Sequence, residues 1–159
     1  MKVTEYLANQ TERIAAGLAN FISTTNPDKL NWKPELPGSK GTRSVLEQVS
    51  ECVQVNLMMA KLFRGESVTA TSGGMPVLEF SDTAAAKEAL IESAAEFASV
   101  IRNLDETALE KTYSHPRGEI LGQNMMLMAL RNMAYHAGQI NLIQMLDGDA
   151  EFHVPPNWR

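Results

Sequence analysis

The sequence predicts an all-α protein that folds as a single four-helix bundle over residues 1–159. Four segments repeat apolar residues at three- and four-residue spacing, which is the pattern of a helix that buries one face. Between them lie two long connections, 24–43 and 66–80, which are rich in Pro, Gly, Ser and Thr. Because connections of this length often cross the end of a fold, we expect at least one pair of sequential helices to run parallel.

The composition is that of one globular domain, with 44% apolar and 21% charged residues. The net charge of −5 and a pI near 5.2 argue against binding to nucleic acid, because a phosphate backbone selects basic surfaces. The single cysteine, Cys52, excludes an intramolecular disulfide and fits a reducing compartment. We see no secretory signal, and polar residues interrupt the apolar stretch 125–146, so no membrane span is expected. The expected location is the cytoplasm.

The first helix is predicted from Val3 to about Ser23 and ends before Pro27, because the residue that precedes a proline is disfavoured in a helix. Its expected apolar stripe consists of Val3, Leu7, Ile14, Leu18 and Phe21.

The second helix begins at a capping box, in which the side chains of Ser44 and Glu47 each satisfy a free backbone amide of the first turn. Gly65 supplies the left-handed stop. The expected buried stripe consists of Val45, Val49, Cys52, Asn56, Ala60 and Phe63.

The third helix opens near Ser81-Asp82 and ends around 103–105, with a buried stripe of Ala86, Leu90, Ala94, Phe97, Ile101 and Leu104. The fourth and longest helix is predicted to follow the turn 115–118 and to run over 119–146.

Asn132 and His136 are the most informative residues of the fourth helix, because they are one turn apart on its apolar stripe. Buried polar groups cost roughly 1 to 3 kcal/mol when they have no partner. The pair therefore needs each other, a water, a metal or a ligand. The simplest interpretation is a core histidine that Asn132 satisfies.

Two stretches carry a resemblance to a known family. Tyr135-His136-Ala137-Gly138-Gln139-Ile140 is followed by Leu146-Asp147-Gly148-Asp149, and Arg43 to Val49 opens the second helix. These stretches resemble the DinB-like (YfiT-like) superfamily of four-helix bundles, whose members typically carry a His-Xaa-Gly-Gln-Ile stretch. The order and length of the four segments agree, so the resemblance covers nearly the whole chain.

The resemblance implies a metal site that has lost most of its ligands. Family members that bind metal use three histidines, and the corresponding positions here are Gln48, Asn132 and His136. Carboxamide oxygens compete poorly for nickel or zinc, so we expect no resident cofactor and at most adventitious nickel or zinc. Cys52, one turn after Gln48, and Gln139, within the family stretch, complete the candidate ligand-binding residues, although a buried cysteine is usually structural.

Two functions follow from the resemblance. The preferred one is a metal-free small-ligand-binding or stress-related accessory bundle that is not an enzyme. The alternative is a transferase or isomerase that depends on a divalent metal and a thiol, because characterised relatives use a metal to bind and activate a low-molecular-weight thiol. The sequence has no phosphate loop, no Cys-Xaa-Xaa-Cys motif and no Glu-Xaa-Xaa-His pair, since the residue three before His136 is Met133.

A homodimer is also expected, because Met126, Met133 and Tyr135 lie off the Asn132/His136 stripe and would otherwise be exposed. The remaining histidines, His115 and His153, are expected to be exposed turn residues. The two tryptophans, Trp32 and Trp158, are expected to cover an end of the bundle.

Overall fold

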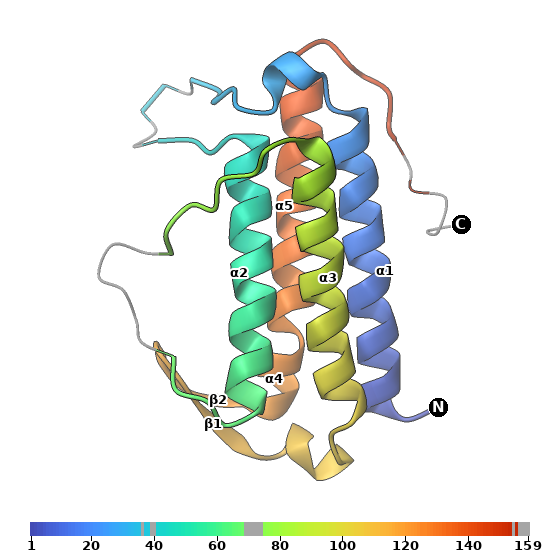
Figure 1. Ribbon diagram of the computed structural model, residues 1–159, viewed down its shortest axis with the longest axis vertical. Coiled ribbons are helices and arrows are strands. Elements are labelled where there is room, and N and C mark those ends of the chain that lie inside the picture. The colour runs from blue at the N-terminus through green and yellow to red at the C-terminus, as the bar shows by residue number, and fades with distance from the viewer. Residues whose placement is uncertain (36, 39–40, 69–74, 154, 156–159) are drawn as a thin grey trace.

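The computed structural model describes residues 1–35, 37–38, 41–68, 75–153 and 155. These residues form a four-helix bundle with a small hairpin at one end, which confirms the predicted all-α class (Figure 1). The four long helices are α1 (Val3–Thr24), α2 (Val45–Phe63), α3 (Thr83–Arg102) and α5 (Met128–Leu146).

The packing order of the helices differs from their order in the chain. Helices α1 and α2 each pack against both α3 and α5, so α1 and α2 lie on opposite corners of the bundle. Figure 1 shows that α2 and α3 run in one direction and that α1 and α5 run in the other. The predicted parallel sequential pair is therefore α2 and α3. Residues 36, 39–40 and 69–74 of the two long connections lie outside the described residues.

The starts of α2 and α3 follow directly from their capping residues. The Glu47 amide donates to Ser44 Oγ at 3.3 Å and the Ser44 amide donates to Glu47 Oε2 at 3.0 Å, so the predicted capping box is confirmed. Asp82 caps α3 by accepting from the Ala85 amide at 2.8 Å. Gly65, with φ +78°, follows α2 as predicted.

The buried face of α1 agrees with the predicted stripe except at its start. Val3 is exposed, whereas Thr4, Ala8 and Thr11 are buried together with Leu18. Leu18 and Phe21 of the predicted stripe are buried and Leu7 and Ile14 pack against the core, so the prediction was wrong only for Val3, and it did not include the buried threonines. The Thr11 hydroxyl donates to the Leu7 carbonyl at 2.9 Å, so this helix satisfies it internally and can bury it.

The predicted fourth helix over 119–146 begins too early. Strands β1 (Thr112–His115) and β2 (Gly118–Leu121) form an antiparallel hairpin in which His115 is the partner of Gly118. A one-turn helix, α4 (Gly122–Met126), and Leu127 then precede α5, so α1 and not the last helix is the longest. Short 3-10 turns, η1 (Pro27–Lys29) and η2 (Glu106–Leu109), follow α1 and α3.

Several predictions of exposure were also wrong. Met126 is fully buried on α4, which packs against the segment 106–109, β1 and β2, and Met133 is fully buried on α5, which packs on α1 and α2. His115 is buried, and His153 is half-buried beside Asp149, with 2.6 Å between Nε2 and Oδ2. Tyr135 is 65% exposed, as expected.

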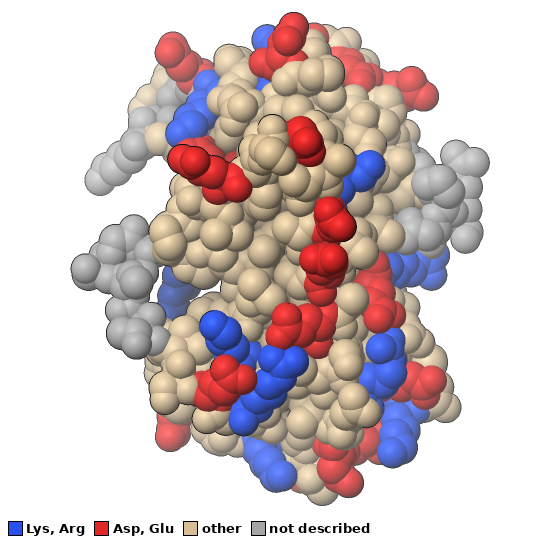
Figure 2. Space-filling view, viewed as in Figure 1, with Lys and Arg blue, Asp and Glu red and all other residues tan. Residues whose placement is uncertain are grey.

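Trp32 packs against the core with Lys29 Nζ 4.7 Å from its ring centroid, whereas Trp158 lies outside the described residues. Glu88, Glu92 and Glu96 recur every four residues on α3. Figure 2 shows several acidic side chains in a line on the face of the molecule turned to the viewer. Over the described residues, no helix has the length and hydropathy that crossing a bilayer requires.

Candidate functional site

The polar residues singled out in the sequence meet where α2 faces α5. The capping box fixes the start of α2 at Val45, so Gln48 and Glu51 fall one turn apart on its first two turns. On α5, Asn132, His136 and Gln139 follow the same three- and four-residue spacing. Since α2 and α5 pack against each other, the two sets of side chains are brought into contact.

Gln48 determines which nitrogen of His136 carries the proton. The Gln48 amide nitrogen donates to the Arg43 carbonyl at 3.2 Å, so the Gln48 carbonyl oxygen is the atom that faces the ring. That oxygen lies 3.2 Å from His136 Nδ1, and Gln139 Oε1 lies 2.8 Å from the same nitrogen. Because both neighbours of Nδ1 are acceptors, Nδ1 bears the hydrogen.

The other ring nitrogen, His136 Nε2, is buried and has no hydrogen-bond partner among the described residues. Glu51 Oε1 lies 3.5 Å away, too far for a good hydrogen bond. Burial lowers the pKa of His136 below its ordinary value, and the charge of Arg43 adds to this, although the bond to Gln139 opposes it. The ring is therefore neutral near pH 7 and presents the Nε2 lone pair as an acceptor.

Glu51, which the sequence analysis did not select, is the central residue of this cluster. Its carboxylate forms an ion pair with Arg43 and accepts from the Asn132 amide nitrogen at 3.3 Å. The second polar atom of Asn132, Oδ1, is buried and has no partner in the part of the chain that the structure describes. A usable signal was the spacing: Glu51 comes three residues after Gln48, so both share one face of α2.

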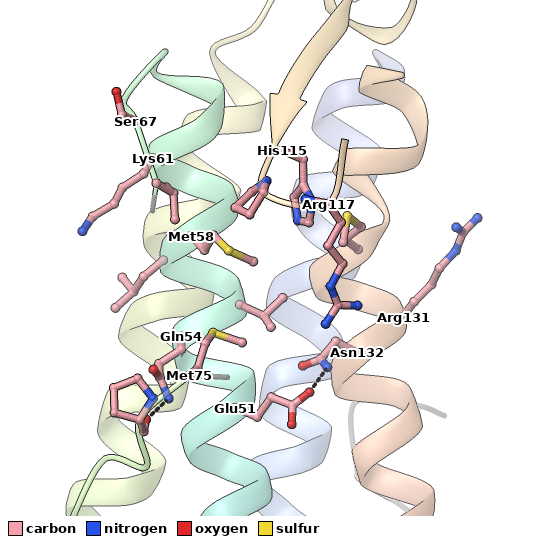
Figure 3. A pocket seen from close by; sticks show the side chains of 16 residues that line it. Glu51, Gln54, Met58, Lys61, Ser67, Met75, His115, Arg117, Arg131 and Asn132 are labelled. Carbon is pink, nitrogen blue, oxygen red and sulfur yellow. Dashed lines mark hydrogen bonds between the residues drawn. The ribbon is translucent and has the colours of Figure 1, made fainter. Parts of the chain in front are cut away.

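Two cavities meet at Glu51. The larger, of about 720 Å³, extends toward the hairpin, and the residues drawn in Figure 3 line it, including Glu51, Asn132, His115 and Arg117. The smaller cavity, of about 400 Å³, lies on the other side of Glu51 and is lined by several of the polar residues that meet between α2 and α5. These residues are Arg43, Gln48, Glu51, His136 and Gln139, with Tyr135 and Leu142 at its wall.

The structure separates the five candidate residues into three groups. Gln48, His136 and Gln139 are in direct contact, and Asn132 joins them only through Glu51 rather than by bonding His136. Cys52 is fully buried in the core and lines neither of the two cavities. Burial raises the pKa of its thiol, so the thiolate that would act as a ligand or nucleophile is disfavoured.

The side chains present do not fit a divalent metal of the kind that the family resemblance implies. Gln48 contacts the Nδ1 edge of the ring, whereas the free lone pair of His136 is on Nε2. Near Nε2 the remaining donors are Asn132 and a Glu51 carboxylate that already pairs with Arg43. In the described part of the chain, no three His, Cys, Asp or Glu side chains gather closely enough to hold a metal ion.

Comparison with known proteins supports the same fold. The family model of the DinB superfamily matches residues 10–140, a range that contains Gln48, Glu51, Asn132, His136 and Gln139. No curated protein matches the chain significantly. Because the family match spans most of the chain and the helices form the expected bundle, the chain belongs to the DinB superfamily.

Proposed function

We propose that this member of the DinB superfamily is a metal-free small-ligand-binding bundle whose ligand occupies the larger cavity. One observation carries the proposal: Asn132 Oδ1 and His115 Nε2 belong to residues that line this cavity, and both atoms are buried without a partner among the described residues. Leaving such atoms unpaired costs about 1–3 kcal/mol each, so a polar occupant would stabilise the folded protein when these two side chains turn to meet it.

The size and lining of the cavity support a small organic ligand. Its volume of about 720 Å³ lies within the usual range of small-molecule sites, roughly 300–1,000 Å³. Apolar side chains make up much of its wall, and a few polar groups are placed among them. In ligand sites of this kind the apolar contacts supply affinity and the polar groups fix the orientation of the ligand. The apolar side chains are Val55, Leu57, Met58, Val68, Met75, Pro76 and Met128.

The alternative, a transferase or isomerase dependent on a metal and a thiol, has weaker support. That chemistry needs strong metal ligands, and of the three triad positions only His136 is a histidine. The Gln48 oxygen is also engaged on the opposite ring edge. We therefore propose binding without metal-dependent catalysis, in a cytoplasmic protein.

The test is to identify what the protein carries and where. Protein purified without a metal-affinity column is analysed for metal, and its extract is analysed by mass spectrometry for co-purified small molecules. The compounds found are then added back in thermal-shift assays to the native chain and to Met58→Trp, which fills the cavity. We expect substoichiometric metal and a thermal shift only in the native chain. Stoichiometric nickel or zinc would favour the metal-dependent alternative, and equal shifts in both chains would place the ligand elsewhere.

A second copy of the chain is the partner we propose. The outer face of α5 exposes Tyr135, Leu142, Met145 and Leu146, with exposed fractions between 48% and 65%. These residues replace the buried Met126 and Met133 as the basis for a dimer. Because α5 packs its other faces on α1 and α2, this apolar stripe is free to pack against a second α5.

A further inference from the structure

The hairpin places two nitrogen-rich side chains at the wall of the larger cavity. His115 ends β1 and Arg117 lies in the two-residue turn before Gly118, so the turn presents both side chains from one short segment. Figure 3 shows the Arg117 side chain reaching from the hairpin toward Asn132 and Glu51, with His115 beside it.

His115 offers a hydrogen-bond donor that lacks an acceptor. The Arg117 backbone amide donates to His115 Nδ1 at 3.1 Å, so Nδ1 is the unprotonated nitrogen. The hydrogen of the ring is therefore on Nε2, which is buried and has no partner in the described part of the chain. A buried N–H of this kind requires an oxygen acceptor, and the protein supplies none there among the described residues.

Arg117 adds a positive charge that no described carboxylate neutralises. Glu51, the acidic residue of the cavity wall, forms its ion pair with Arg43 instead. Lys61 and Arg131 also line the cavity, although Figure 3 shows both side chains extending outward. The wall is thus locally positive on a protein whose net charge is −5.

The rest of the wall is apolar and pliable. Met58, Met75 and Met128 contribute unbranched side chains that adapt to the shape of an apolar ligand. An anionic group beside the hairpin and a hydrocarbon body between α2 and α5 would satisfy both parts of the wall at once.

We propose that the cavity takes an organic carboxylate with an apolar body, whose carboxylate is held by the Arg117 guanidinium and by the His115 Nε2–H once that ring turns toward the ligand. This assignment rests on the proposed ligand-binding function and adds the chemical class of the ligand. A guanidinium pairs with a carboxylate through charge-assisted hydrogen bonds, which are stronger than bonds between neutral groups. Asn132 Oδ1 would accept from a donor on the ligand or from a bridging water.

The test compares octanoate with octanol, which share a chain length and differ in charge, by isothermal titration. We expect octanoate to bind the native chain at least about tenfold more tightly, as a charge-assisted bond predicts. Arg117→Gln should remove that preference and leave the affinity for octanol unchanged. Arg131→Gln, at the same cavity with an outward side chain, is the matched control and should keep the preference. His115→Phe should weaken octanoate severalfold, and Met58→Trp should abolish the binding of both probes.

The outcomes separate this proposal from the proposed function. Equal affinity for octanoate and octanol would overturn the anionic class while leaving ligand binding in place. A preference that survives Arg117→Gln would overturn the role of Arg117. Failure of both probes to bind the native chain would overturn the apolar carboxylate class, and the co-purification experiment would still decide the proposed function. Binding that Met58→Trp leaves intact would overturn both proposals.

Discussion

Gln48 on α2 holds its carbonyl oxygen 3.2 Å from Nδ1 of His136 on α5. Gln48 can present that oxygen because its own amide nitrogen is engaged by the Arg43 carbonyl. A residue of one helix therefore sets the tautomer of a buried imidazole on another, and Gln139 at 2.8 Å reinforces the choice. As a result, the Nε2 lone pair has no hydrogen-bond partner among the described residues, on a side chain that lines the smaller cavity.

The first prediction concerns the dependence of stability on pH. Burial lowers the pKa of His136 in the folded state, whereas the unfolded chain titrates near about 6.5. Between these two values the unfolded state binds more protons, so this contribution to stability is present above about pH 6.5 and is lost as pH falls. Urea unfolding should give a lower free energy of unfolding at pH 5.5 than at pH 7.5. His136→Gln should flatten this dependence.

Two comparisons isolate the contribution of His136. Burial lowers the pKa of His115 as well, so His115→Gln should remove a separate part of the same dependence. Gln48→Glu places a carboxylate beside the Nδ1 hydrogen and should raise the pKa of His136, as measured by NMR titration of the ring. An unchanged pKa in Gln48→Glu would contradict the contact between the two side chains.

The sequence was sufficient to predict most of the helical framework. α2 and α3 were predicted well because each has a regular apolar stripe and a clear start signal. These signals are the Ser44 capping box and the Asp82 cap. The hairpin was missed because each strand has only four residues, too few for an alternating pattern to stand out from the helical period that follows.

The candidate site was predictable only in part. Helical spacing placed Asn132 and His136 on one face of the fourth helix, and the family resemblance added Gln48 to them. Glu51 and Arg117 were missed because charged residues are usually solvated, and only the fold shows which ones line a cavity. The tautomer of His136 depends on a contact between residues 88 positions apart, which no local pattern contains.

The second prediction tests the role of Glu51. Glu51→Gln loses the ion pair with Arg43 but keeps an oxygen for the Asn132 amide. Because that pair is partly exposed, the change should cost less than about 1 kcal/mol. Glu51→Leu leaves the Asn132 amide without its acceptor and should cost roughly 1–3 kcal/mol. Urea unfolding of both variants measures the difference, and equal losses would argue that the Asn132 bond is unimportant.

The third prediction tests the dimer. Light scattering at micromolar concentration should report twice the 17.5 kDa of one chain. Leu142→Glu, within the exposed stripe of α5, should give the mass of a monomer, because it would place unpaired carboxylates in the interface. Ile91→Glu is the matched control, since Ile91 is similarly exposed but lies on α3, across the bundle from α5. A monomeric native chain would refute the proposal.

The fourth prediction concerns the contact between α4 and η2 at the end of the bundle. A Cβ atom on Gly122 would lie 1.8 Å from the Ala108 carbonyl oxygen, so the backbone would have to move to accept any side chain. Gly122→Ala should therefore destabilise the protein by about 1–3 kcal/mol. Gly138, within α5, has open space around its added Cβ, and Gly138→Ala should be neutral or stabilise by up to about 1 kcal/mol. Thermal melts that rank the two variants in the reverse order would contradict the packing described at Ala108.

The fifth prediction asks whether the three polar positions descend from a metal triad. Gln48→His combined with Asn132→His replaces two amides by imidazoles while leaving Gln139 to hold the Nδ1 hydrogen of His136. His136 Nε2 then remains available as the third donor. Because imidazole is a far better ligand for nickel or zinc than a carboxamide, the double variant should bind these ions tightly once the new ring at position 48 turns from the Nδ1 edge of His136 toward Nε2, and the native chain should bind them only weakly.

The pH dependence of that binding identifies the ligands. Imidazole must be neutral to coordinate a metal, so the affinity of the double variant should fall as pH drops below about 6.5. Isothermal titration with nickel and with zinc, at two pH values, measures this for both chains, and the two single variants show whether each new histidine contributes. Equal, negligible binding by the native and double-variant chains would show that the backbone at positions 48, 132 and 136 cannot converge on one ion. In that case Gln48 would contact the Nδ1 edge of His136 because the two helices place it there. A lost metal triad would then not explain its position.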